Sequence, residues 1–145
     1  KITHVIHQVG RSEVDEIAKI YQQNNISAKV VNFIDDMASA YVSADLIICR
    51  AGASTVAEVS CAGIAAIFVP YPYAVDDHQT INTRQLVAAG AAKLLSQTNL
   101  TPDLLAELID DLSYAKCKAM GENARNIGIV DSTEQICRYI IEQIK

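Results

Sequence analysis

The sequence has no long apolar run and no cluster of basic residues. A membrane-spanning helix needs about 20 consecutive apolar residues, and no stretch approaches that length. Its 12 Lys and Arg are scattered among 17 Asp and Glu, and the formal net charge is −5. Nucleic acids and anionic membrane surfaces are bound by clustered Lys and Arg. We therefore expect no nucleic-acid partner and no transmembrane segment, and the first residues also lack the architecture of a signal peptide.

The cysteines lack the spacing of a metal site or a disulfide framework. Cys49, Cys61, Cys117 and Cys137 are far apart, and no C-x-x-C pair occurs. Three of them lie in apolar or helical stretches, which favours buried free thiols. Unpaired cysteines are typical of a reducing compartment, so we expect a cytoplasmic location.

The common hydrolase and phosphate-loop motifs are also missing. There is no G-x-S-x-G, H-E-x-x-H or G-x-x-x-x-G-K-[ST], and His4, His7 and His78 do not have the spacing of metal ligands. The pairs Asp35-Asp36 and Asp76-Asp77 stand at expected helix starts, where acidic residues usually complement the helix dipole. We expect no metal and no cofactor, and no residue is a convincing catalytic base.

What the sequence does contain is an alternation of short apolar runs with longer segments of helical period. Half of the 145 residues are hydrophobic and a fifth are charged, which is typical of one compact globular domain. Strands are expected over 3–9, 28–33, 46–49, 65–69 and 92–95, and helices over 11–24, 35–41, 55–62, 76–89 and most of the chain from 101. This order predicts an α/β fold, a Rossmann-like parallel sheet sandwiched by helices. Because the chain does not begin with Met and enters an apolar run directly, we expect a fragment.

Ligands of such folds bind beyond the carboxyl ends of the strands. The first segment there runs from Arg50 to Glu58, where a strand meets a small-residue turn that opens a helix. Helix N-termini bind diphosphates, Gly52 permits close approach, and Glu58 can accept hydrogen bonds from both ribose hydroxyls. The alternative needs no ligand, because Thr55 and Glu58 also fit a capping box, and by pattern alone the cap is favoured.

A second polar cluster opens the helix expected from Asp76. His78, Gln79 and Asn82 lie three and four residues apart, so their side chains can point together at a polyhydroxylated ligand. In the alternative interpretation Asp76 caps the helix, Gln79 completes the cap, and His78 is solvated. Taken singly, the residues favour that structural role.

Two further segments end strands at the same expected edge. Phe33, Ile34 and Met37 could hold a planar base beside exposed backbone, although such residues are more often core, with Asp35 as an N-cap. His7-Gln8-Val9-Gly10 ends the first strand with a glycine turn. Each signal is weak alone, and their shared position at one sheet edge is what favours a ligand site.

The order and wording of these motifs resemble the MurG family of glycosyltransferases, which have two Rossmann-like domains facing a cleft, the GT-B fold. The matching segments are His7-Gln8-x-Gly10, Phe33-Ile34-Asp35-Asp36-Met37, Arg50-Ala51-Gly52-Ala53-Ser54-Thr55-x-x-Glu58, Ala62-Gly63-Ile64, Phe68-Val69-Pro70, Asp77-His78-Gln79-x-x-Asn82 and Ala89-Gly90-Ala91-Ala92. So many matches in the same order make the resemblance specific and nearly end to end.

The resemblance implies a role for each segment. Uracil would lie against the backbone around Phe33 and Ile34, with Met37 near the nucleotide. The phosphates would meet Ala53, Ser54 and Thr55, and Glu58 would bind the ribose. The sugar hydroxyls would be addressed by His78, Gln79 and Asn82. Arg50 matches the family in type, and either a structural role at the strand end or a ligand contact is possible.

The resemblance also implies the reaction of the intact enzyme. An inverting hexosyltransferase would move N-acetylglucosamine from UDP-GlcNAc to undecaprenyl-diphospho-N-acetylmuramoyl-pentapeptide, converting lipid I to lipid II in peptidoglycan synthesis. Residues 1–145 would be the donor-binding C-terminal domain. They lack the family's Gly-rich loop and the N-terminal domain that holds the lipid acceptor and the base. The fragment alone is expected to be inactive, and the intact enzyme to lie on the inner face of the cell membrane.

The sequence departs from the family at two places. Ala65 stands where the family often has proline, and Pro72-Tyr73-Ala74-Val75 replaces a differently worded loop, which leaves the donor sugar less defined than the fold. Two other functions stay open: the donor subunit of another two-part GT-B glycosyltransferase, and a non-catalytic module that binds nucleotide sugars.

Overall fold

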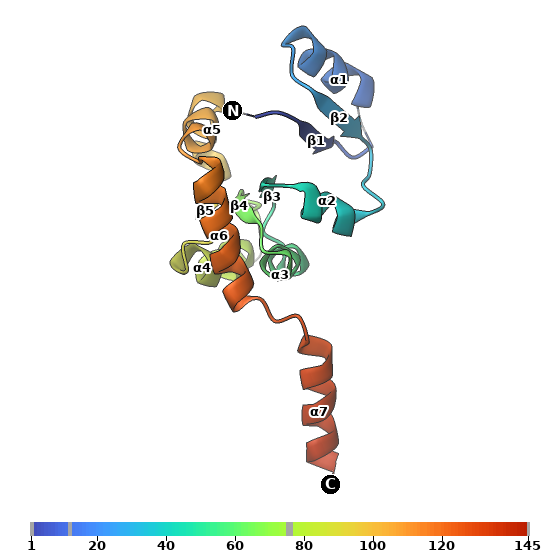
Figure 1. Ribbon diagram of the computed structural model, residues 1–145, viewed down its shortest axis with the longest axis vertical. Helices are drawn as coiled ribbons and strands as arrows, with labels where there is room; N and C mark the ends of the chain where they lie inside the picture. Colours follow the sequence, from blue (N-terminus) through green and yellow to red (C-terminus); the bar gives the residue numbers. More distant parts are fainter. Residues whose placement is uncertain (1, 12, 75–76, 145) are drawn as a thin grey trace. The chain divides into compact units, whose positions relative to one another are not determined.

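The computed structural model describes the chain except for Lys1, Ser12, Val75, Asp76 and Lys145. It divides into two compact units, Lys1–Ser43 and Ala44–Lys145. Figure 1 shows the order of the elements along the chain.

The first unit is a β-α-β-α segment. Its elements are β1 (Val5–Gln8), α1 (Val14–Gln23), β2 (Ala28–Val31) and α2 (Met37–Ser43). The two strands pair in parallel, with Val5 opposite Ala28 and Gln8 opposite Val31. Gly10 makes the turn after β1 with a φ of 72°, in the left-handed region that glycine adopts without steric cost, so the expected glycine turn is confirmed.

The second unit contains a three-stranded parallel sheet in the order β3-β4-β5. Its elements are β3 (Leu46–Cys49), α3 (Ala53–Ala62), β4 (Ala65–Phe68), α4 (His78–Ala88), β5 (Ala92–Leu94), the 3-10 turn η2 (Gln97–Asn99), α5 (Pro102–Asp110), α6 (Tyr114–Ile127) and α7 (Ser132–Ile144). Every residue of the central strand β4 is buried. Such a strand is covered on both faces and reads as a continuous apolar run, as the sequence predicted.

Helices α5 and α6 complete the core of this unit. Ile67, Val69 and Leu95 form one buried cluster, against which apolar residues of α5 pack. A second cluster joins Ala65 to Cys117 and Met120 of α6. The expected start of α5 is confirmed, because the Thr101 hydroxyl accepts a hydrogen bond from the Leu104 N–H at 3.1 Å and Pro102 occupies the first turn.

The predicted Rossmann-like α/β fold with parallel strands is confirmed within each unit. Among the described residues β1 pairs with β2 in the first unit, and β4 pairs with β3 and β5 in the second. The alternation of strands and helices specifies the elements and their parallel direction. Which strands become neighbours depends on the crossover connections, and these are set by tertiary packing.

Two expected helix starts are corrected. α2 begins at Met37, and its cap is Asp36 rather than Asp35, because Asp36 Oδ1 accepts a hydrogen bond from the Ser39 N–H at 2.9 Å. Hydrogen bonds from the Ser39 hydroxyl and N–H hold the pKa of the Asp36 carboxyl below its usual range. α3 begins at Ala53, two residues before the expected start at Thr55.

The cysteines are unpaired, but not all of them are buried. Cys117 is buried, Cys49 and Cys61 are half-buried, and Cys137 is exposed, so the expectation of buried thiols is wrong for Cys137. It lies in α7, which has no buried residue among those described. Burial raises the pKa of the Cys49 thiol to about 12.

This difference predicts selective alkylation. The thiolate is the reactive form, and at pH 8 Cys49 stays protonated because its pKa lies far above the solution pH. We expect iodoacetamide to modify Cys137 first and Cys49 only after unfolding. Peptide mass spectrometry at increasing reaction times measures the order. Early modification of Cys49 would show that β3 is not packed as described.

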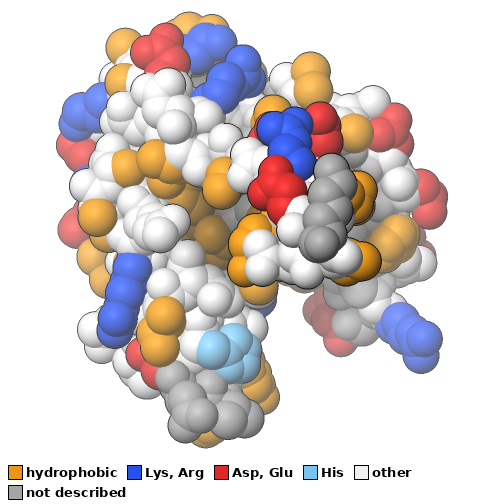
Figure 2. Space-filling model, turned by 90° about the horizontal axis from the view of Figure 1, so that it is seen from below, with side chains coloured by type: hydrophobic (Ala, Val, Ile, Leu, Met, Phe, Trp, Pro, Cys, Tyr) orange, Lys and Arg blue, Asp and Glu red, His pale blue; other side chains and the backbone are white. Residues whose placement is uncertain are grey.

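On the face that Figure 2 shows, Lys and Arg are interspersed with Asp and Glu. Within the described residues, no helix combines the length and apolar character that crossing a bilayer requires.

Candidate functional site

The N-terminus of α3 presents backbone donors without a side-chain cap. Its N-cap is Gly52, and the first intrahelical bond runs from the Val56 N–H to the Gly52 carbonyl at 2.9 Å. The N–H groups of Ala53, Ser54 and Thr55 therefore precede the hydrogen-bonded ladder. The resemblance assigns these three residues to the phosphates, and the positive end of the helix dipole favours an anion there.

The capping-box interpretation of Thr55 and Glu58 is wrong. A capping box places its Ser or Thr at the N-cap, whereas Thr55 lies inside α3 and Gly52 is the N-cap. Glu58 is consequently beyond the first turn, where its carboxylate cannot reach the N-cap N–H. Its side chain is exposed rather than directed into the core, as a ligand contact requires.

The start of α4 is joined to the residue just before this turn. Gln79 Oε1 accepts hydrogen bonds from the Tyr71 N–H at 2.9 Å and from the Ala51 N–H at 3.3 Å. Asn82 Nδ2 donates to the Ala51 carbonyl at 3.1 Å. Both backbone polar groups of Ala51 are thus held by α4, which places Gln79 and Asn82 beside the phosphate-assigned turn.

These contacts also correct the structural interpretation of α4. Gln79 does not complete a cap, because its oxygen binds Ala51 and Tyr71, and Asp76 lies outside the described residues. The N-cap is Asp77, whose carboxylate accepts a hydrogen bond from the Thr80 hydroxyl at 2.7 Å and makes no side-chain cap bond. His78 is exposed at the first position of α4.

The three residues assigned to the base lie in the first unit, around the start of α2. Phe33 is 66% exposed, so the interpretation of this aromatic residue as plain core is wrong. Ile34 and Met37 are half-buried. The Ile34 N–H donates to Gln8 Oε1 at 2.9 Å, so the side chain that ends β1 fixes the backbone of this segment.

Three positioning contacts were not predicted from the sequence. Gln8 holds Ile34, Gln79 bridges Ala51 and Tyr71, and Arg50 donates to the carbonyls of Val69 and Pro70. Each joins residues well separated in the chain. Only the common position of these residues at strand ends could have indicated such contacts.

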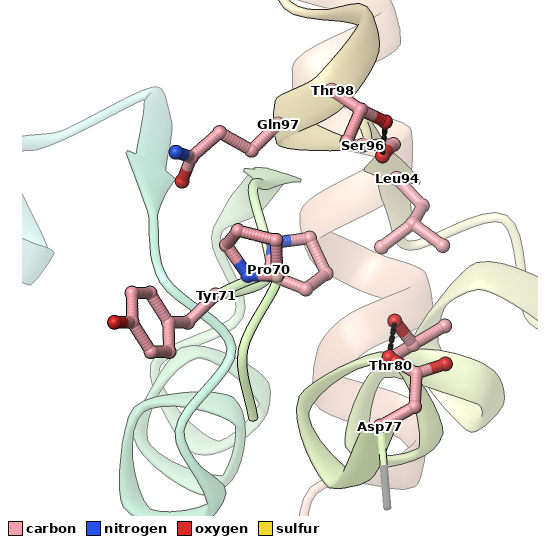
Figure 3. A pocket seen from close by; sticks show the side chains of 9 residues that line it. Pro70, Tyr71, Asp77, Thr80, Leu94, Ser96, Gln97 and Thr98 are labelled. Atoms are coloured by element: carbon pink, nitrogen blue, oxygen red, sulfur yellow. Dashed lines mark hydrogen bonds between the residues drawn. The ribbon is translucent and has the colours of Figure 1, made fainter. Parts of the chain in front are cut away.

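An open groove of about 320 Å³ lies beside the start of α4. Its lining residues are Pro70, Tyr71, Pro72, Asp77, Thr80, Leu94, Ser96, Gln97 and Thr98. In Figure 3 the Tyr71 ring points away from Asp77 and Thr80, on the other side of Pro70. The groove includes none of the predicted site residues, so it lies next to the candidate donor site without forming part of it.

No group of three His, Cys, Asp or Glu among the described residues is arranged to hold a metal ion. The chemistry that the site can offer rests on peptide N–H groups, amides and one carboxylate. Such groups suit an anionic, hydroxyl-rich ligand.

Parallel strands, crossover helices and a candidate site at the carboxyl ends of β3 and β4 are the features of a Rossmann-like α/β domain. The chain belongs to the family described as the glycosyltransferase family 28 C-terminal domain, whose pattern matches residues 1–136.

Two relatives are similar to this chain over most of its length. One, of Neisseria gonorrhoeae, is 47% identical over 135 residues, which is 93% of this chain and 38% of the relative. Another, of Dechloromonas aromatica, is 48% identical over 139 residues, or 94% of this chain and 39% of the relative. Both are named UDP-N-acetylglucosamine–N-acetylmuramyl-(pentapeptide) pyrophosphoryl-undecaprenol N-acetylglucosamine transferase.

A solved structure gives the same result for the fold. The crystal structure of MurG from Acinetobacter baumannii superposes with a TM-score of 0.90 at 42% identity, covering 96% of this chain and 41% of that one. The chain therefore spans about two fifths of the length of the proteins that it matches.

Proposed function

We propose that this chain is the donor-binding part of an inverting glycosyltransferase that takes N-acetylglucosamine from UDP-GlcNAc. The proposed acceptor is undecaprenyl-diphospho-N-acetylmuramoyl-pentapeptide, and the proposed product is the lipid-linked disaccharide of peptidoglycan synthesis. The observation that carries the proposal is the 47% identity to a transferase named for that donor and acceptor, over 93% of this chain. The arrangement of α3 and α4 supports it.

The proposed donor site uses three kinds of contact. The N–H groups of residues 53–55 bind the diphosphate, and the Glu58 carboxylate binds the ribose hydroxyls. Residues of the first turns of α4, His78, Gln79 and Asn82, bind the sugar. Phe33, Ile34 and Met37 of the first unit hold the uracil.

The proposed reaction is a direct displacement at the anomeric carbon. A sugar hydroxyl of the acceptor forms the new bond to that carbon as the bond to the diphosphate breaks, and UDP leaves with the bonding electron pair. Negative charge grows on the leaving phosphate, where the donors at the start of α3 stabilise it without reorganisation. The hydroxyl proton passes to a base that we place in the acceptor-binding part of the full-length protein, at the inner face of the membrane.

Titration with nucleotides tests this proposal. We expect UDP-GlcNAc to shift the backbone amide NMR signals of residues 33–37, 52–58 and 77–82. UDP should shift the first two segments, whereas UDP-glucose should bind more weakly than UDP-GlcNAc. Shifts confined to the groove beside Leu94 and Ser96, or no saturable binding by the full-length protein, would contradict the proposed site.

Gly52 offers a separate test, because its backbone does not require glycine. Its φ is −62°, and an added Cβ would have only the Thr55 hydroxyl oxygen nearby, at 3.7 Å. We therefore expect Gly52→Ala to cost less than about 1 kcal/mol of stability. The same methyl group would project where the diphosphate must approach, so UDP affinity should fall about tenfold. Calorimetric binding and thermal unfolding measure the two effects, and unchanged affinity would place the phosphates elsewhere.

A further inference from the structure

Arg50 joins the end of β3 to the turn that follows β4. Its Nη1 donates to the Val69 carbonyl at 3.2 Å and to the Pro70 carbonyl at 3.1 Å. The guanidinium carbon also lies 5.6 Å from the centre of the Tyr71 ring. The planar guanidinium can make the hydrogen bonds and the ring contact together, which the single ammonium of lysine does less well.

The residues that follow Arg50 and Pro70 both donate a hydrogen bond to the same oxygen, Gln79 Oε1. Ala51 follows Arg50, and Tyr71 follows Pro70, and the donor in each is the backbone N–H. The contacts therefore form a closed ring through Arg50, Pro70, Tyr71, Gln79 and Ala51. Movement of the turn after β4 would remove one of the two donors that hold the Gln79 oxygen.

Fixing that oxygen also fixes the other half of the Gln79 amide. The carbonyl oxygen and the NH2 group lie on opposite sides of a planar unit, so two N–H donors on the oxygen determine where Nε2 points. We propose that Arg50 is a positioning residue for the donor sugar, and that it acts through Gln79. This inference rests on the proposed function, in which Gln79 binds the N-acetylglucosamine unit.

A positioning role for Arg50 can be distinguished by experiment from direct binding of the phosphates. An arginine that touched the diphosphate would strengthen binding of UDP and of UDP-GlcNAc alike. An arginine that orients Gln79 strengthens binding of UDP-GlcNAc but not of UDP, because only the former carries the sugar. The difference between the affinities for the two ligands is therefore the quantity to measure.

The experiment uses the full-length protein and calorimetric titration with UDP and with UDP-GlcNAc. The variants are Arg50→Gln, Arg50→Lys, Gln79→Ala and the double variant Arg50→Gln/Gln79→Ala. Arg84→Gln is the matched control, because Arg84 is an exposed arginine on the same helix as Gln79. Binding of UDP by each variant also shows that it is folded.

We expect Arg50→Gln to weaken UDP-GlcNAc about tenfold while UDP affinity stays within about twofold, a coupling of the size seen for residues in one network. Arg50→Lys should recover part of the loss. In the Gln79→Ala background, Arg50→Gln should have little further effect, and Arg84→Gln should behave as the wild type.

Three results would overturn the inference. Equal weakening of UDP and UDP-GlcNAc would make Arg50 a phosphate ligand, and additive losses in the double variant would show that it acts independently of Gln79. If Gln79→Ala weakened UDP-GlcNAc binding and Arg50→Gln did not, the positioning role of Arg50 would be excluded. The proposed function would still stand. Failure of the wild-type protein to bind UDP-GlcNAc would overturn both.

Discussion

Replacing Glu58 by alanine in the full-length protein is expected to raise the KM for UDP-GlcNAc about 100-fold. The carboxylate is proposed to accept hydrogen bonds from both ribose hydroxyls, and hydrogen bonds to a charged group contribute about 1.5–3 kcal/mol. Glu58→Gln keeps one acceptor oxygen, so its KM should rise about tenfold. Initial-rate kinetics at varied donor concentration measure both effects.

Thermal unfolding distinguishes this role from a structural one. Glu58 is exposed and lies beyond the first turn of α3, so its replacement should cost less than about 1 kcal/mol of stability. Glu107→Ala is the matched control, because Glu107 is an exposed glutamate in α5. We expect that variant to keep the wild-type KM. A Glu58 variant that loses stability but keeps the wild-type KM for the donor would show that the carboxylate does not bind the ribose.

Replacing Gly121 by alanine is expected to destabilise the protein by about 3 kcal/mol, because α6 packs against the end of α3 at this residue. A Cβ on Gly121 would be pressed against the carbonyl group of Gly63, which is backbone and cannot rotate away. Gly63 itself has a φ of 70°, and the neighbouring Ala62 carbonyl accepts a hydrogen bond from Arg125 Nη2 at 2.9 Å. Equilibrium denaturation by urea measures the loss.

The direction of this effect is informative. In an open helix, Gly→Ala stabilises by about 1 kcal/mol, because alanine has the higher helix propensity. A loss of stability therefore reports steric contact between α6 and α3. Gly52→Ala, where an added methyl group has space, serves as the comparison. Stabilisation of Gly121→Ala would show that the two helices are further apart than the structure has them.

In the candidate site, local sequence patterns predicted the elements, whereas the contacts between them depend on tertiary packing. The sequence located the turn after β3 and placed the start of the helix at about Thr55, where Thr55 and Glu58 also fit a local cap. The structure begins α3 at Ala53, and Ala51 is held by Gln79 and Asn82. Those two residues lie 28 and 31 positions along the chain, beyond the reach of any local rule.

The same holds for the segment assigned to the base. The sequence could place Phe33 and Ile34 at a strand end, but it favoured a core role for each residue taken singly. The exposure of Phe33 excludes a core role for that residue, and the backbone N–H of Ile34 is held by Gln8. The adjacent acids at 35 and 36 were equivalent as caps by type, and the backbone of α2 selects Asp36.

The order of strands and helices, the parallel direction of the strands and the buried character of β4 were fixed by the sequence itself. Hydrophobic period and composition are local properties, and they determine which segments can form each element. Tertiary structure alone decided the ring of contacts through Arg50 and Gln79. A hydrogen bond between distant residues forms only where the packed strands and helices bring its donor and acceptor together.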